Sequence, residues 1–238
     1  MILNDNAKEI IKSRYLWVTK GETEWDDIAK RVGSVVGGGS TPSDVYTDSY
    51  IEMLSEGWFI AGGRINRNAG RPRGSMFNCY NVPIGDSIEE ITDAYSACMR
   101  LWKDGGGTGL TFSDLRPSGA PLISTEGESS GPMPFLWGLN EAGRAIRTGG
   151  QRRAAGLALL AVSHPNIMDF ITCKQNDGDY DLFNLSVGIT EEFIDAVRED
   201  KEWNLTWRNK VFDTIPARDL WSAMVKGLSN NGEPGIIN

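Results

Sequence analysis

The sequence predicts an α/β fold, with a helical N-terminal region over residues 1–75 and a parallel sheet with intervening helices over residues 76–238. Apolar residues recur at helical spacing in the first region, as amphipathic helices require. In the second region short apolar runs alternate with helical patterns, and strands separated by helices pair in parallel. The run AGLALLAV, residues 155–162, is apolar enough for a strand that is buried on both faces.

The N-terminal region is expected to hold helices at about 6–18, 24–34 and 44–56. The loop 37–44 contains Ser43, a candidate cap for the third helix. The stretch 62–75, which is rich in arginine and glycine, is expected to be irregular.

The second region is expected to contain five strands, at 76–84, 107–112, 155–162, 182–189 and 234–238. Helices are expected between them at 87–103, at 134–147, from Pro165 in a first turn, at 190–199 and at 216–229. The fourth strand alternates sharply, with Phe183, Leu185, Val187 and Ile189 on one face and Asn184, Ser186 and Gly188 on the other. A polar face inside a buried sheet suggests a lined cavity.

Composition limits the function classes. The chain has 238 residues, 40% of them apolar and 24% charged, which is ordinary for a globular protein. Its net charge of −8 argues against binding a nucleic acid polymer through bulk positive charge. No apolar run reaches the roughly 18 residues of a membrane span, and no signal peptide is visible at the N-terminus, so a cytoplasmic location is expected. The three cysteines form no CxxC pair, which indicates neither a zinc site nor a disulfide framework.

Two glycine-rich loops are candidate ligand sites. The stretch DGGGTGLTFSDLRPSG, residues 104–119, lacks the lysine of a Walker loop, and its glycines enter a strand rather than the helix that a dinucleotide fingerprint requires. It is either a helix C-cap turn or, because three glycines exceed what a cap needs, a place where a ligand approaches the backbone. The stretch RTGGQRRAAGLALL, residues 147–160, is either a solvated basic turn or a loop that grips a nucleotide, since guanidinium groups suit phosphates and base edges.

Single candidate residues have two interpretations each. Asp86 and Ser87 can cap the helix that follows, or Asp86 can accept a hydrogen bond from a ribose hydroxyl. Cys79 is either a small buried hydrophobe in mid-strand or a reactive thiol. His164, the only histidine, precedes a helix-opening proline and is not expected to be a general base. The sequence has no evident acid–base set for hydrolysis.

Several segments together resemble the catalytic chain of ribonucleotide reductases, particularly the adenosylcobalamin-dependent (class II) branch. They occur in the family's order: GGRINRNAG, FNCYNVPIGDSIEEI, GGGTGLTFSDLRPSG, SGPMPF, TGGQRRAAG, SHPNIMDFI, FNLSVGITEEF and EPGIIN. The resemblance implies a ten-stranded α/β barrel of two five-stranded parallel half-sheets, with the active site inside. This chain would form the N-terminal helical region and the first half-sheet.

The resemblance also implies roles for individual residues. Cys79 would be one of two cysteines that reduce the substrate ribose, and Asn78, Gly106, Gly107 and Arg153 would contact the substrate. A deoxynucleoside triphosphate effector would be held by Asp86, Ile88, Arg116, Gln151 and Arg152. Residues 117–131 and 148–155 would be the two specificity loops. Thr148 departs from the family, which usually has glutamine there.

The family's radical cysteine lies in an Asn-x-Cys-x-Glu motif of the second half-barrel, and this sequence has no such motif. We therefore expect a split or truncated enzyme that needs a second chain carrying the radical cysteine, forms a dimer, and uses a nucleotide substrate, a dNTP or ATP effector and an external dithiol reductant. Adenosylcobalamin, held mainly by the other half, is the expected radical source, and a separate metal-containing subunit is the alternative. Rival functions are a non-catalytic deoxynucleotide sensor and an assembly subunit without a ligand.

Overall fold

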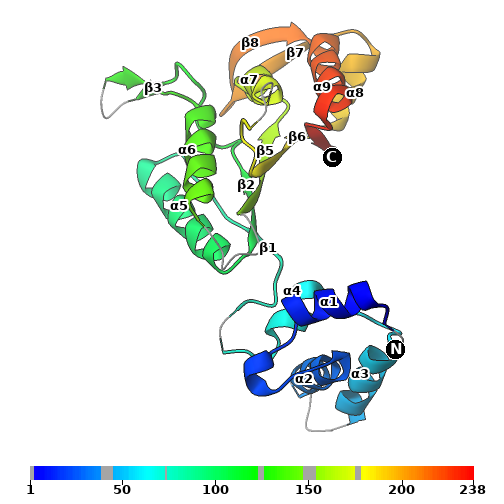
Figure 1. The fold of residues 1–238 in the computed structure, drawn as a ribbon. Helices are drawn as coiled ribbons and strands as arrows, with labels where there is room; N and C mark the ends of the chain where they lie inside the picture. Colours follow the sequence, from blue (N-terminus) through cyan, green and yellow to red (C-terminus); the bar gives the residue numbers. More distant parts are fainter. Residues whose placement is uncertain (1–2, 39–44, 73, 123–125, 147–153, 175–177) are drawn as a thin grey trace. The chain divides into compact units, whose positions relative to one another are not determined.

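The computed structural model describes residues 3–38, 45–72, 74–122, 126–146, 154–174 and 178–238. The chain divides into two compact units, Met1–Asn78 and Cys79–Asn238 (Figure 1). The sequence placed the boundary three residues earlier, between residues 75 and 76.

The first unit is helical in its described part, as predicted. Its elements are α1 Asp5–Arg14, a 3-10 turn Val18–Lys20, α2 Trp25–Gly37, α3 Val45–Glu56 and α4 Gly63–Asn68. The α2 and α3 helices pack closely, and the Trp25 indole donates a hydrogen bond to Leu54 O (2.7 Å). The predicted cap Ser43 lies outside the described residues.

The α4 helix corrects the prediction that residues 62–75 are irregular. Six residues are too few to show helical periodicity in the sequence. The helix is held instead by its polar side chains: Asn66 is buried, and its amide donates to Ala61 O (2.7 Å).

The second unit is built on a parallel five-stranded sheet, which confirms the α/β prediction. Its strands are β1 Cys79–Asn81, β2 Gly107–Thr111, β5 Ala155–Ala161, β6 Phe183–Gly188 and β9 Gly235–Ile237, side by side in that order (Figure 1). The β1 strand is shorter than the predicted 76–84, so Cys79 begins it rather than lying in its middle. Pairing with β2 starts at the register Cys79–Gly107.

Helices α5 Ile88–Lys103, α6 Pro132–Ala145, α7 Ile167–Thr172, α8 Glu191–Arg198 and α9 Ala217–Asn231 accompany the sheet. The prediction that Pro165 lies in the first turn of its helix is wrong, because α7 begins two residues later. The Asn166 N–H donates to His164 Nδ1 (3.1 Å), so residues 164–166 form a turn ahead of the helix.

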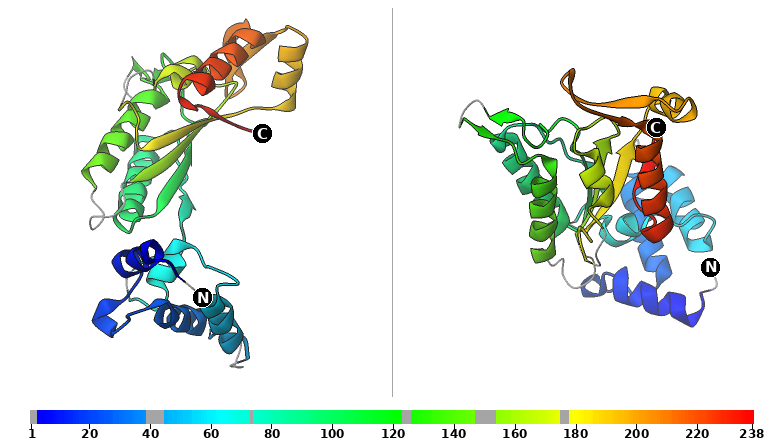
Figure 2. Two further views of the ribbon diagram at one scale, coloured as in Figure 1. Left: turned by 45° about the vertical axis from the view of Figure 1, so that its right-hand side comes forward. Right: turned by 90° about the horizontal axis from the view of Figure 1, so that it is seen from above.

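Two antiparallel pairs outside the main sheet were not predicted. They are β3 Pro121–Leu122 with β4 Gly127–Glu128, and β7 Glu202–Trp207 with β8 Lys210–Pro216. Figure 2 shows the β7–β8 hairpin, in orange, beside α8 and α9. Its two-residue turn, Arg208 and Asn209, has φ of 46° and 63° without a glycine, so the usual sequence signal of a tight hairpin is missing.

One core joins the sheet to its helices. It contains Leu110, Ala158, Leu160, Leu185 and Val187 from the strands, with residues of all five helices, Trp102, Leu139, Phe170, Phe193 and Leu220 among them. No helix in the described ranges is both long and apolar enough to cross a membrane.

Candidate functional site

The sheet has one face covered by helices and one open face. Because side chains alternate along a strand, the buried residues Thr108, Leu110, Ala158 and Leu160 define the covered face, and their neighbours along β2 and β5 point the other way. The strand register extends this open face across the sheet in three rows. The first row holds Cys79, Gly107 and Ala155, and the second holds Asn81, Gly109, Leu157 and Asn184. The third row holds Thr111, Leu159, Ser186 and Gly235.

Cys79 therefore lies on the open face, among glycines and small or polar side chains. Its side chain is exposed. The predicted polar face of β6 is the same face, since Asn184 is exposed while Phe183, Leu185 and Val187 are buried in the core. The two faces thus separate an apolar, helix-packed side from a side with room for a ligand.

The glycines at positions 105, 106 and 109, before and within β2, lie in different structural surroundings. A Cβ at Gly109 would meet no atom within 4 Å, so nothing in the described structure fills the space above it. A Cβ at Gly106 would lie 2.9 Å from the Tyr80 ring and 3.2 Å from Leu101 O, so this glycine is required by packing. Gly105, with φ of 74°, donates to Trp102 O (2.7 Å) and ends α5. The cap interpretation is therefore confirmed for Gly105, and the approach of a ligand to the backbone stays a prediction for Gly109.

The three cysteines differ in their surroundings. Cys98 is fully buried in α5, and Cys173, partly buried, packs against the core after α7. Burial raises the pKa of Cys98 to about 11 and that of Cys173 to about 12, so both remain thiols at neutral pH. Neither lies on the open face with Cys79.

Alkylation should therefore distinguish these thiols. At pH 8 the folded chain is expected to react with iodoacetamide at Cys79 alone, because the thiolate is the nucleophile and the other two thiols are protonated and shielded. Peptide mass spectrometry after a short pulse measures the modified fraction at each cysteine. In urea all three should react, and equal labelling of Cys98 or Cys173 in the folded chain would contradict the assigned burial.

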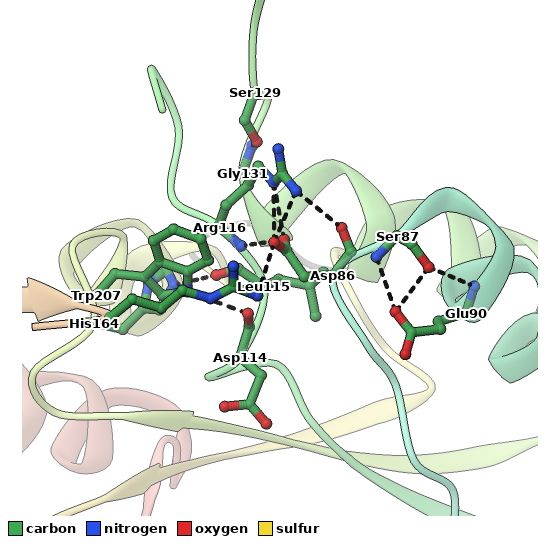
Figure 3. A network of polar contacts seen from close by, with 11 residues as sticks. Asp86, Ser87, Glu90, Asp114, Leu115, Arg116, Ser129, Gly131, His164 and Trp207 are labelled. Atoms are coloured by element: carbon green, nitrogen blue, oxygen red, sulfur yellow. Dashed lines mark hydrogen bonds and ion pairs between the residues drawn. The ribbon is translucent and has the colours of Figure 1, made fainter. Parts of the chain in front are cut away.

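A second group of predicted residues meets at the end of the loop before α5 (Figure 3). Asp86 Oδ1 accepts hydrogen bonds from the Arg116 backbone N–H (2.7 Å) and Nε (3.1 Å), and Oδ2 is 2.9 Å from Arg116 Nη2. The bond to Asp86 raises the pKa of Arg116. Ile88 lies two residues after Asp86, in the first turn of α5, and is 61% exposed. The helix cap itself is Ser87, which with Glu90 forms a capping box.

The structure adds Arg208, which the sequence did not indicate. From the turn of the β7–β8 hairpin, its Nη2 lies 3.4 Å from Asp86 Oδ2. Its guanidinium lies over the Trp207 ring, 4.4 Å from the centroid, and the Trp207 indole donates to Asp114 O (3.1 Å). No sequence pattern connects residue 208 to residue 86, because the contact depends on an unpredicted hairpin.

His164 supports this segment rather than forming a reactive group. It is 1% exposed, and burial lowers its pKa, so the imidazole is neutral. Since Nδ1 accepts from the Asn166 N–H, Nε2 carries the proton and donates to Leu115 O (2.9 Å). Asn166 Oδ1 in turn accepts from the Ser118 N–H (3.0 Å), which fixes the start of the predicted first specificity loop.

Some predicted site residues cannot be placed. Gln151, Arg152 and Arg153, with most of the predicted second loop 148–155, lie outside the described residues. Asn78 is exposed and is the last residue of the first unit.

In the part of the chain that the structure describes, no group of three or more His, Cys, Asp or Glu side chains could hold a metal ion.

The sheet unit matches a known protein family. Residues 77–238 match the family model of the ribonucleotide reductase barrel domain. The chain belongs to the ribonucleotide reductase family. The matched region begins two residues before β1 and includes Cys79, the open face and the Asp86–Arg116 pair.

Individual reductases are similar over most of the chain. The vitamin B12-dependent ribonucleoside-diphosphate reductase of Thermoplasma acidophilum is 34% identical over 83% of this chain and 26% of its own length. The enzyme of the same name from Mycobacterium tuberculosis is 35% identical over 81% and 28%. The ribonucleoside-diphosphate reductase large subunit of Vaccinia virus is 32% identical over 80% and 29%. The chain thus spans just over a quarter of the length of these relatives.

Proposed function

We propose that this chain supplies one half of the catalytic barrel of a ribonucleotide reductase, an oxidoreductase that converts ribonucleotides to 2′-deoxyribonucleotides in the cytoplasm. The observation that carries the proposal is the barrel-domain match over residues 77–238, within which Cys79 is an exposed thiol on the open face of the sheet. A second polypeptide, carrying the radical cysteine, would cover that face.

In this proposal Cys79 is one of two reducing thiols. The ribose loses its 2′-hydroxyl as water and gains a hydrogen at C2′, while two thiols become a disulfide. A thiyl radical on the second polypeptide starts the reaction by removing a ribose hydrogen, and an external dithiol later reduces the disulfide. We assign the second reducing thiol to a residue outside this chain, because Cys98 is buried among the helices and Cys173 is partly buried against the same core.

The small residues around Cys79 support a sugar-binding role. Gly107 lies beside Cys79 in the register, and Gly109 leaves open space one row further along β2. Backbone without side chains lets a ribose and its phosphates approach closely. We propose that Asn78, Gly106 and Gly107 line this region and that Arg153 reads the substrate base.

A separate effector site is proposed at Asp86, Ile88 and Arg116, completed by Gln151 and Arg152. Two features support this site. The Asp86 carboxylate accepts hydrogen bonds and could accept one from a ribose hydroxyl. The apolar side chain of Ile88 is exposed, which suits contact with a base. The Thr148 position, where the family usually has glutamine, would alter how the second loop conveys effector identity to the substrate. A dimer would be the assembled state.

The vitamin B12-dependent relatives favour adenosylcobalamin as the radical source. The one histidine of the sequence, His164, is buried with both ring nitrogens bonded and is therefore not available as a ligand to the cobalt. Adenosylcobalamin, when bound, supplies radical chemistry. We therefore assign its binding mainly to the second polypeptide.

Reconstitution tests the proposal. This chain, mixed with a polypeptide that carries the rest of the family's barrel, adenosylcobalamin, a dithiol and a ribonucleotide, should form deoxyribonucleotide, whereas each polypeptide alone should form none. Chromatography of the nucleotides measures the product. Failure of every such pair to associate and turn over would reject the reductase function.

A deoxynucleotide sensor is the second candidate function. It is favoured by one observation: Asp86, Ile88 and Arg116 all belong to this chain, and none of them is part of the open face that carries Cys79. A sensor would bind dNTP but need no thiol. An assembly subunit would bind none, which calorimetry with dATP and dTTP would reveal.

A further inference from the structure

We propose that Arg208 is a further nucleotide-binding residue at the Asp86–Arg116 pair: it occupies Asp86 when no nucleotide is bound, and it contacts the phosphates of a nucleoside triphosphate when one is bound. The inference rests on the proposed effector site. It adds the β7–β8 hairpin to that site and makes Arg208 the residue that distinguishes a nucleotide from a nucleoside.

The contacts of Asp86 indicate which partner a ligand would replace. Arg116 holds both carboxylate oxygens with its backbone N–H, Nε and Nη2 at 2.7–3.1 Å. Arg208 makes a single contact to Oδ2 at 3.4 Å, the longest of the set. A hydroxyl that donates to Asp86 therefore displaces Arg208 at the smallest cost.

Exposure leads to the same conclusion. The Arg208 side chain is 66% exposed, against 28% for Arg116 and 10% for Asp86. Ion pairs with an exposed partner contribute little to stability, so the Asp86–Arg208 contact opens easily. The more buried Asp86–Arg116 pair stays together and keeps the carboxylate in place.

A displaced Arg208 remains at the site because its platform is fixed. The guanidinium lies over the Trp207 ring. The Trp207 indole N–H donates to Asp114 O, two residues before Arg116 (Figure 3). The turn backbone of Arg208 and Asn209 is in the left-handed region, which sets the direction of the side chain. Movement of the guanidinium across the ring would leave it beside a ligand bound to Asp86.

Charge identifies the ligand group. Arg116 is neutralised by its bidentate pairing with Asp86, so among the described residues Arg208 is the cation whose charge becomes available when a hydroxyl takes its place at Asp86. The chain as a whole carries −8, so a polyanionic ligand needs such local positive charge. Guanidinium groups bind phosphate oxygens through paired hydrogen bonds. A nucleoside triphosphate offers both the hydroxyl and the phosphates.

Calorimetry with dTTP and thymidine on the 238-residue chain tests the inference. Arg208→Ala should raise the Kd of dTTP about tenfold, the loss of a charge-assisted hydrogen bond, and leave the Kd of thymidine within about twofold. Arg208→Lys, which keeps the charge but loses the paired hydrogen bonds and the planar group on Trp207, should give a Kd of dTTP between those of the unchanged chain and Arg208→Ala. Salt should weaken dTTP binding less in Arg208→Ala than in the unchanged chain.

Lys210→Ala is the matched control, since Lys210 carries the same charge on the same hairpin, lies over Phe212 and is absent from the Asp86 contacts. It should change neither Kd by more than about twofold. Equal urea midpoints for the variants show that the hairpin is folded. If the unchanged chain binds dTTP, and Arg208→Ala either leaves the Kd of dTTP unchanged or raises the Kd of dTTP and of thymidine equally, Arg208 does not contact the phosphates. The proposed effector site is retained in that case. If the unchanged chain binds no dTTP, the effector site and this inference fail together.

Discussion

Replacing Cys79 by serine is expected to abolish deoxynucleotide formation by a reductase assembled with this chain, with a loss on the order of 10³-fold or more. A hydroxyl cannot be oxidised to a disulfide, so the two electrons that reduce the ribose have no source. Serine is nearly the size of cysteine, and position 79 is exposed at the start of β1, so folding should be unaffected. Product formation with an external dithiol, measured by chromatography, gives the effect.

Cys173→Ala is the matched control because its thiol, with a pKa raised to about 12 by burial, is unsuited to redox exchange. It should retain most of the turnover. Binding of dTTP should be equal in the unchanged chain and in Cys79→Ser. Full turnover by Cys79→Ser would remove Cys79 from the reaction, and unchanged nucleotide sensing with no turnover in any assembly would favour the sensor.

Much of the fold could be predicted because it depends on local patterns. The α5 helix shows its apolar face and its cap at Ser87 in the sequence, β5 shows the continuous hydrophobicity of a central parallel strand, and β6 shows the alternation of a strand with one polar face. The elements that were not predicted, α4 and the β7–β8 hairpin, lack such local patterns. Helix α4 is too short for periodicity, and the β7–β8 turn has no glycine and places Arg208, which disfavours positive φ, beside Asn209.

The site was only partly visible for a related reason. Alternation along β6 predicted a polar face, and the parallel register then brings Asn184 into the row of Gly109 and Asn81. Cys79 was expected in mid-strand, yet it is the first residue of β1, since strand ends are set by pairing and not by local sequence. The contact of Arg208 with Asp86 joins positions 122 residues apart, which no local pattern encodes.

Replacing a glycine by valine is expected to have opposite effects on the free energy of unfolding on the two faces of the sheet. Gly109→Val, on the open face, should leave the free energy of unfolding unchanged or raise it by up to about 1 kcal/mol, because valine favours strands and a Cβ there meets no atom within 4 Å. Gly156→Val, on the covered face, should lower it by about 3 kcal/mol. A Cβ at Gly156 would lie 2.3 Å from Phe183 Cε1, and Phe183 is fully buried against Trp102.

Neither glycine has positive φ, so packing and not backbone strain separates the two variants. Urea unfolding measures their stability. In a reconstituted reductase, Gly109→Val should nevertheless lose about tenfold or more of its turnover, because its methyl groups would fill the space that a ribose beside Cys79 requires. A protein that is stable but inactive is the signature of a surface kept open for a ligand. If Gly109→Val were as unstable as Gly156→Val, the face would be packed; if it were stable and fully active, the substrate would not lie over β2.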